Sequence, residues 1–312
     1  MTSTAGTTPE LRRVADGLRF PEGPVDLGDG TVAVCEIEAG VVSRVGGDGT
    51  VERIADVGGG PNGAALGPDG ALYVVNNGGF LWSDLGGVLV PLDLETGANE
   101  PPDFAGGWVD RVDLDTGEAT TLYRECDGRR LASPNDIVFD AEGGFWFTDL
   151  GKMRTHDLDR GGLFHARADG SGITQVVSGL LGANGVGLSP DGGTVYVAES
   201  YTGRLLAWEL VGPGRVAATG PGHGGRCVVA TAAGFDSLAV EADGRVVVAA
   251  ITHGLCVIEP DSGEHEFLEM PDPLVTNLCF AGDDRRTAFI TMSGGGWLAE
   301  ATWPRPGLAL EH

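Results

Sequence analysis

The hydrophobic positions of this chain are grouped in short runs that Gly, Pro and Asp interrupt from one end to the other. Apolar residues repeated at intervals of three and four, which an amphipathic helix requires, are rare. Short apolar runs bounded by turn residues are typical of β-strands that are connected by tight turns. The pattern therefore predicts an all-β protein.

One spacing pattern recurs along the chain. A polar residue is followed by an apolar patch, then by an acidic residue and Gly, and then by a strand-like run. Five copies and a degenerate sixth start at Glu22, Asn62, Asn135, Asn184, Asp236 and Thr276. The starts lie 40, 73, 49, 52 and 40 residues apart, and about 40 to 50 residues form one blade of a β-propeller. The repeat predicts a six-bladed β-propeller with four-stranded blades.

The last repeat leaves too little chain for a complete blade. A strand-like run at 11–15 precedes the first repeat as 51–55 precedes the second, so we expect it to supply the missing outer strand and close the ring. Residues 10–309 then form one domain. The flanking segments are predicted to be a disordered stretch at 1–9 and an expression-tag remnant at 310–312. An insertion near 80–107 is predicted to lie as a lid over the channel.

The starting residues of the repeats are expected at the same end of the innermost strands, so their side chains would converge on the central channel. This ring contains carboxylates, amides and a hydroxyl, and no His or Cys. Oxygen ligands alone suit a hard cation such as Ca²⁺. The alternative is a water-filled channel whose polar residues are satisfied by hydrogen bonds.

Composition narrows the range of partners. The 45 acidic side chains against 20 basic ones give a formal charge of −25, which opposes binding to nucleic acids and to anionic membrane surfaces. No apolar run approaches the roughly 18 residues of a membrane-spanning helix. The N-terminal residues lack the basic start and apolar run of a secretory signal. We therefore expect a cytoplasmic protein that acts on a small molecule.

The repeats carry motifs that resemble the gluconolactonase, regucalcin and luciferin-regenerating-enzyme family. The match covers nearly the whole chain, with Phe-Pro-Glu-Gly-Pro at 20–24, Gly-Gly-Gly-Pro-Asn-Gly at 58–63, Ser-Pro-Asn-Asp at 133–136, Ala-Asn-Gly at 183–185 and Asp-Ser-Leu-Ala-Val at 236–240. The resemblance implies a propeller hydrolase with one divalent metal, usually Ca²⁺, with Zn²⁺, Mg²⁺ or Mn²⁺ as alternatives. It also implies the metal ligands Glu22, Asn135, Asn184 and Asp236.

The chain departs from the sugar-lactone members of this family at one position. They commonly have an Arg two residues before the equivalent of Asn135, where it can hold substrate hydroxyls, and this chain has Ser133. The insertion instead supplies apolar surface, including Trp82 and, at its far edge, Trp108. Both features predict an apolar substrate, which Ser133, Trp82 and Trp108 are expected to contact. An oligomer contact, such as a homodimer interface, is the alternative role of the apolar insertion.

Residues that follow the second strand of a blade return to the same end of the channel. Asn77 and Glu199 are therefore candidates for substrate binding, although each is at least equally expected as a turn residue. Asn62 is expected to contact substrate or a metal-bound water. Asp136 directly follows a predicted ligand in its strand, so its side chain is predicted to point away from the ring.

These observations predict a metal-dependent hydrolase that opens an apolar lactone. The metal would polarise the carbonyl group, and Asp236 is the candidate to accept the proton of the attacking water or to attack the carbonyl itself. One alternative is a phosphotriesterase that uses the same ligands. Another is a non-catalytic calcium-binding or ligand-binding propeller.

Overall fold

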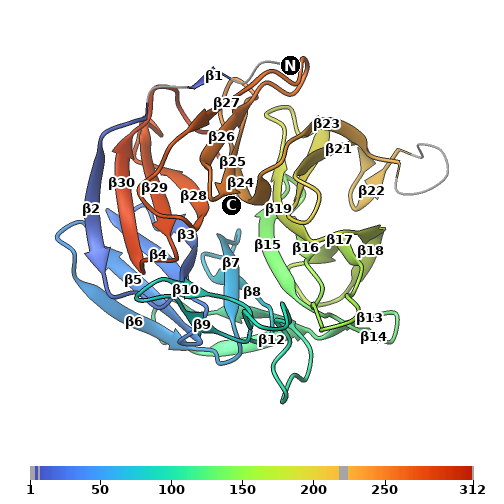
Figure 1. The fold of residues 1–312 in the computed structure, drawn as a ribbon. Helices are drawn as coiled ribbons and strands as arrows, with labels where there is room; N and C mark the ends of the chain where they lie inside the picture. Colours follow the sequence, from blue (N-terminus) through green and yellow to red (C-terminus); the bar gives the residue numbers. More distant parts are fainter. Residues whose placement is uncertain (1–3, 6–7, 218–223, 311–312) are drawn as a thin grey trace.

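Six antiparallel sheets surround a central channel in the computed structural model, which describes residues 4–5, 8–217 and 224–310 (Figure 1). The described residues include no helix, so none is long and apolar enough to cross a membrane. In each sheet the first strand of the repeat lines the channel and later strands lie progressively outward. The predicted six-bladed β-propeller is confirmed.

The first three blades each contain four main strands. Blade one contains β3 (Pro21–Asp26), β4 (Thr31–Glu36), β5 (Val41–Gly46) and β6 (Val51–Asp56). Blade two contains β7 (Pro61–Leu66), β8 (Leu72–Asn76), β11 (Trp108–Val112) and β12 (Ala119–Tyr123). Blade three contains β15 (Pro134–Phe139), β16 (Gly144–Asp149), β17 (Gly161–Arg167) and β18 (Ile173–Leu180).

The other three blades repeat this order. Blade four contains β19 (Ala183–Leu188), β20 (Thr194–Glu199), β21 (Arg204–Gly212) and β23 (Arg226–Ala230). Blade five contains β24 (Gly234–Val240), β25 (Val246–Ile251), β26 (Gly254–Ile258) and β27 (His265–Leu268). Blade six contains β28 (Val275–Ala281), β29 (Thr287–Met292), β30 (Trp297–Thr302) and β2 (Leu11–Asp16). Short pairs lie outside this repeat: β9 (Ser83–Asp84) with β10 (Leu89–Val90), β13 (Glu125–Cys126) with β14 (Arg129–Arg130), and β22 (Arg215–Val216) with β21.

The N-terminal part of the chain closes the ring. Strand β2 pairs antiparallel with β30, with Leu11 opposite Ala301, which confirms the predicted closure. Before it, β1 (Thr4–Ala5) pairs parallel with β27 on the outside of blade five. The exposed edge of β27 offers the backbone partners for this pairing, and disorder of the segment 1–9 stays a prediction. Residues 1–3, 6–7 and 311–312 of the predicted flanking segments lie outside the described residues.

The hydrophobic core lies between neighbouring blades. In β4, Val32 and Val34 pack against blade six, whereas Ala33 and Cys35 pack against blade two. The same alternation fills the other interfaces between adjacent blades. It follows from the two-residue side-chain period of a strand that is buried on both faces.

Candidate active site

The six polar residues that start the repeats lie near one end of the innermost strands. These six residues are Glu22 on β3, Asn62 on β7, Asn135 on β15, Asn184 on β19, Asp236 on β24 and Thr276 on β28. All are buried except Asp236, which is partly exposed. At this level the pairing of each innermost strand with its neighbour shifts register. Such bulges re-aim side chains, and here they recur in every blade around the channel.

Two carboxylates of this ring lie close enough to affect each other. Oε2 of Glu22 accepts hydrogen bonds from Nδ2 of Asn277 and from the backbone N–H of Gly23, each at 2.7 Å. Burial nevertheless raises the pKa of Glu22. Burial, and next the charge of Glu22, hold the pKa of Asp236 well above its usual range. Both shifts arise mainly because burial removes the charged carboxylates from water.

A third carboxylate, that of Asp136, also lies in the channel. Its Oδ2 accepts a hydrogen bond from the backbone N–H of Val186 in blade four at 3.1 Å, and its Oδ1 accepts one from Ile137 at 3.0 Å. Burial, and then the charge of Glu22, raise the pKa of Asp136 to about 8. Its backbone contacts fit a structural role, and that the side chain points away from the ring stays a prediction. The register of β15 shifts between Pro134 and Ile137, directly at this residue.

The ring amides provide a test of whether a cation would fit. Oδ1 of Asn135 is buried and has no hydrogen-bond partner. Nδ2 of Asn184 donates to Ser200 Oγ at 3.0 Å, and this bond orients the amide. An unpartnered amide oxygen in the same ring as two carboxylates matches the ligands that Ca²⁺ prefers. In the described residues no group of three His, Cys, Asp or Glu side chains has a metal-binding arrangement, so amide oxygens are needed to complete a site.

Glu199 is held by backbone and side-chain donors near its own strand. Its Oε1 accepts a hydrogen bond from the backbone N–H of Leu181 at 2.8 Å, and its Oε2 accepts bonds from Thr202 and Arg204. Counterparts in the first three blades, which also end the second strand, accept backbone N–H bonds in the same way: Glu36 from Arg19, Asn76 from Gly60 and Asp149 from Ser133. These contacts engage both carboxylate oxygens of Glu199 and hold the loop that leads into β19, the innermost strand of the same blade. Its contact with substrate stays a prediction.

Asn77 and Ser133 lie near the ring in blades two and three. Oδ1 of Asn77 accepts a hydrogen bond from Gly79 at 2.8 Å, but its Nδ2 is buried without a partner. Oγ of Ser133 is also buried without a partner. With Oδ1 of Asn135, these are the buried side-chain polar atoms without hydrogen bonds in the part of the chain that the structure describes. All three are on blades two and three, so unused hydrogen-bonding capacity is concentrated on one side of the channel.

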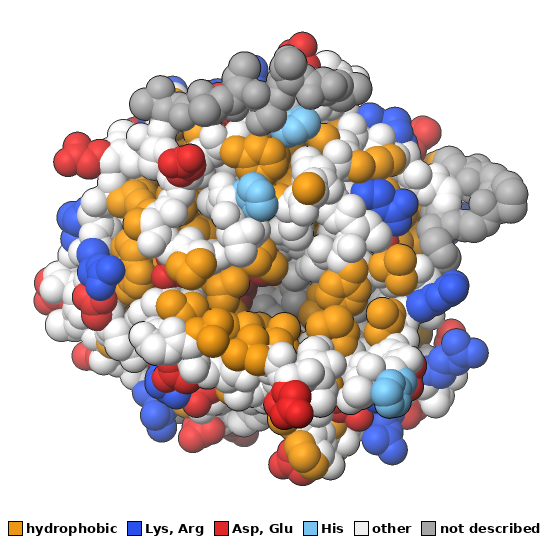
Figure 2. All heavy atoms as spheres, viewed as in Figure 1, with side chains coloured by type: hydrophobic (Ala, Val, Ile, Leu, Met, Phe, Trp, Pro, Cys, Tyr) orange, Lys and Arg blue, Asp and Glu red, His pale blue; other side chains and the backbone are white. Residues whose placement is uncertain are grey.

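The insertion at 80–107 spans the same end of the molecule. Its backbone bonds to blade six, where Leu89 N–H donates to Gly294 at 2.9 Å, and to blade three, where Asn99 N–H donates to Met153 at 2.9 Å. Its apolar residues pack with residues from blades one, three and six. We call this group the rim cluster, and its members are Phe20, Ile37, Phe80, Trp82, Leu89, Leu150 and Leu274. Figure 2 shows a central hollow on this face with hydrophobic side chains around it.

The structure separates the two tryptophans that were predicted to bind substrate. Trp82 belongs to the rim cluster, and its ring centroid lies 5.1 Å from that of Phe20. Trp108 instead donates a hydrogen bond to Asp110, and the guanidinium of Arg124 lies 4.8 Å from its ring centroid. Trp108 is thus engaged within blade two, as expected for a residue of β11, the third strand outward from the channel.

The far end of the channel contains a cavity instead of a ring of polar side chains. A cavity of about 850 Å³ lies there, lined largely by the later halves of the innermost strands and by Leu308. Asp136 and Asn277 are at its inner end. This cavity is separate from the ring, whose six starting residues are not among its lining residues.

The fold and the ring together define a six-bladed propeller with a cluster of oxygen side chains at one end of its channel. A family model described as the SMP-30/Gluconolactonase/LRE-like region matches residues 20–294. The chain therefore belongs to this family.

Curated relatives match shorter parts of the chain. The lactonase drp35 of Staphylococcus saprophyticus is 34% identical over 108 residues, which are 35% of this chain and 32% of the relative. The lactonase drp35 of Staphylococcus haemolyticus is 38% identical over 76 residues, 24% of this chain and 23% of the relative. The matched segment thus spans a third or less of the length of these relatives.

Solved structures match the chain over almost its full length. A gluconolactonase from Xanthomonas campestris has a TM-score of 0.72 at 23% identity and covers 95% of this chain and 90% of its own. Regucalcin from Agrobacterium tumefaciens, described as a calcium-binding protein, has a TM-score of 0.69 at 19% identity, with 98% and 100% covered. These similarities establish the fold.

Proposed function

We propose that this protein is a metal-dependent hydrolase that opens lactones at the ring. The observation that carries the proposal is the unpartnered Oδ1 of Asn135 in the same ring as two carboxylates, the buried Glu22 and the partly exposed Asp236. Burying negative charge and an unsatisfied amide oxygen together is costly unless a cation uses both. Membership of the gluconolactonase family and the lactonase relatives support the reaction class.

The residues that would hold the cation are Glu22, Asn135, Asn184 and Asp236. When bound, a divalent ion such as Ca²⁺ would supply Lewis-acid polarisation of the lactone carbonyl. Asp236 is the ring carboxylate that is partly exposed, so it is best placed to accept a proton from the attacking water. The water oxygen would bond to the carbonyl carbon, the ring C–O bond would break, and Asp236 would return its proton to the leaving alkoxide. The single product is a hydroxy acid that releases a proton to solvent as its carboxylate forms.

Substrate contacts are proposed on the side of blades two and three. The free N–H of Asn77 and the free hydroxyl of Ser133 are donors that the protein itself leaves unused. A lactone has two ester oxygens that could accept them. Asn62, which is buried in the ring, is a further contact to substrate or water.

The rim cluster supports a substrate with an apolar ring or chain. Burial of apolar surface contributes roughly 25 cal/mol per Å², so about 60 Å² of additional contact would strengthen binding about tenfold. Ser133 supplies no charge to hold several hydroxyls. We therefore expect a higher kcat/KM for alkyl-substituted lactones than for glucono-δ-lactone.

The test is a pH-indicator assay of purified protein on sugar lactones, alkyl lactones and aryl phosphotriesters, with chelator and after return of Ca²⁺. We expect proton release from lactones that chelator abolishes and Ca²⁺ restores. Release from phosphotriesters alone would assign the site to that chemistry. Chelator-resistant hydrolysis would contradict the role of the metal, and no hydrolysis of any substrate would favour a binding protein.

A further inference from the structure

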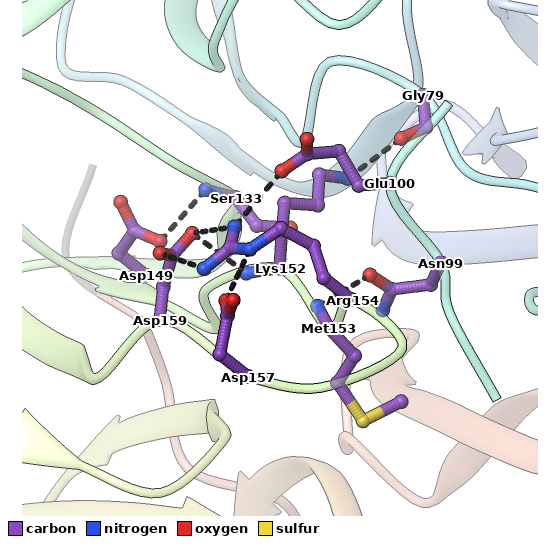
Figure 3. A network of polar contacts seen from close by, with 10 residues as sticks. All are labelled: Gly79, Asn99, Glu100, Ser133, Asp149, Lys152, Met153, Arg154, Asp157 and Asp159. Carbon is purple, nitrogen blue, oxygen red and sulfur yellow. Dashed lines mark hydrogen bonds and ion pairs between the residues drawn. The ribbon is translucent and has the colours of Figure 1, made fainter. Parts of the chain in front are cut away.

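The chain contains a single lysine, Lys152, and its side chain is completely buried. It lies three residues beyond the end of β16, next to the insertion (Figure 3). Nζ donates a hydrogen bond to the backbone oxygen of Gly79 at 2.6 Å. The same atom lies 4.0 Å from the ring centroid of Phe80 and 5.0 Å from that of Phe104. Both rings belong to the insertion, so one ammonium group contacts three residues at or near its two ends.

Burial of this ammonium group is costly, since it is removed from water and bonds to a carbonyl oxygen rather than to a carboxylate. Three carboxylates, Asp149, Glu100 and Asp159, attract its charge without offsetting that cost. Burial accordingly lowers the pKa of Lys152 to about 7. A methionine would fill similar space at no such cost, so the lysine needs an explanation other than stability.

Neighbouring contacts join the insertion to the loop that carries Lys152. Asn99 Oδ1 accepts the backbone N–H of Met153 at 2.8 Å, and Arg154 pairs with Glu100 at 2.9 Å (Figure 3). The insertion is also bonded to blade six through Leu89. The insertion is therefore held in place by polar contacts on both sides of the channel.

Phe80 connects Lys152 to the proposed substrate site. It contacts the ammonium group and also belongs to the rim cluster, where its ring lies 6.2 Å from that of Trp82. A shift of Phe80 would therefore move the apolar surface that surrounds the hollow.

We propose that Lys152 is a positioning residue that fixes Phe80 and the insertion as a wall of the substrate site, and that it thereby sets selectivity for apolar lactones. This proposal rests on the proposed lactone hydrolysis for its effect on selectivity. The effect of Lys152 on the position of the insertion does not depend on the proposed hydrolysis. The attraction of a cation to two aromatic rings and a donor that reaches Gly79 are properties that methionine lacks.

The test compares wild type with Lys152→Met, with Phe104→Leu as a second variant and Arg12→Met as a control. Arg12 forms an exposed ion pair with Glu300 on the outer edge of blade six. We expect Lys152→Met to fold with an unchanged or higher melting temperature. Its KM for an alkyl lactone should rise about tenfold, while kcat on the unsubstituted lactone stays within about twofold. Phe104→Leu should give a smaller rise in KM, and the control none.

Two further readouts separate positioning from a merely structural role. In wild type, the preference for alkyl over unsubstituted lactone should fall as pH rises through about 7, because the neutral amine loses its attraction to the rings; in Lys152→Met it should not vary with pH. Other charged groups face Lys152, namely Asp149, Glu100, Asp159 and Arg154. Their titration changes the rates on both substrates alike, so its effect cancels in the ratio of the two rates. Amide hydrogens of residues 80–82 should exchange faster in Lys152→Met.

The outcomes distinguish the two proposals. If wild type hydrolyses lactones but neither the preference nor the exchange changes in Lys152→Met and Phe104→Leu, Lys152 does not position the insertion. If wild type hydrolyses no lactone, the proposed function fails, and the exchange measurement alone decides the role of Lys152.

Discussion

Asn277 of blade six donates a hydrogen bond from Nδ2 to Oε2 of Glu22 in blade one, at 2.7 Å. The two residues meet where the first and last innermost strands of the propeller are adjacent. Glu22 also accepts a bond from Gly23 on the same oxygen. Oε2 therefore accepts two hydrogen bonds, and the one from Asn277 orients the carboxylate of Glu22.

This relationship predicts that Asn277→Ala weakens metal binding, although Asn277 is not itself a proposed ligand. Loss of a residue that orients a ligand typically costs 10- to 100-fold in metal affinity. Calorimetric titration with Ca²⁺ would measure the change. Asp283→Asn, in the exposed turn after the same strand, is the control and should leave the affinity unchanged. An Asn277→Ala protein with wild-type affinity would show that this bond does not orient Glu22.

The two ring carboxylates should differ in their roles. Asp236→Asn should abolish turnover and retain some metal binding, because Asp236 is also the proposed proton acceptor. Glu22→Gln should lose metal affinity first, and excess metal should restore part of its activity. Initial rates at increasing Ca²⁺ would separate the two effects. Full rescue of both variants by metal would mean that Asp236 is only a ligand.

Glu199 should contribute to stability and not to substrate binding. Glu199→Ala would leave the N–H of Leu181 without its acceptor and Arg204 without its partner. Because the Arg204 side chain is 39% exposed, loss of the pair itself should cost at most about 1 kcal/mol. The unpaired N–H of Leu181 should add about 1–3 kcal/mol, and urea unfolding should show the combined loss. Glu209→Ala, at an exposed position of the same blade, should cost little. A large rise in KM with unchanged stability would instead show that Glu199 binds substrate.

Close approach of the innermost strands depends on Gly23. A Cβ atom there would lie 2.3 Å from the backbone oxygen of Asn62, and φ is +50°. Gly28, with φ of +74°, has nothing within 4 Å of the same position. Gly28→Ala should therefore cost only the backbone strain of about 1–2 kcal/mol, and Gly23→Ala should cost clearly more. Equal free energies of unfolding for the two variants would show that the contact with Asn62 is relieved at little cost.

The repeat in the sequence was sufficient to predict the blades, because Glu22 and its counterparts recur at a spacing that only a propeller blade explains. Side-chain direction at the ring was not predictable. The register shift at Asp136, which governs where this side chain points, leaves no mark in residue type. Glu199 was ambiguous because a carboxylate after a strand suits either a substrate or a backbone N–H.

The length and composition of the insertion were enough to recognise it in the sequence. Its contacts with the blades could not be predicted. Trp82 and Trp108 look equivalent in sequence, and only the structure assigns one to the rim cluster and the other to β11. Lys152 attracted no prediction about function. The sequence shows that it is the only lysine among many arginines. Its burial against Phe80 and Phe104 could not be predicted, because it depends on segments that are far apart in the chain.

The most direct measurement is a crystal structure of the protein grown or soaked with Ca²⁺. We predict one ion at the ring end of the channel, with oxygens of Glu22, Asn135, Asn184 and Asp236 at about 2.3–2.6 Å and waters completing six to eight ligands. A structure at the same Ca²⁺ concentration with no ion bonded to these groups, or with a water held by Asn135 in its place, would contradict the proposed metal centre.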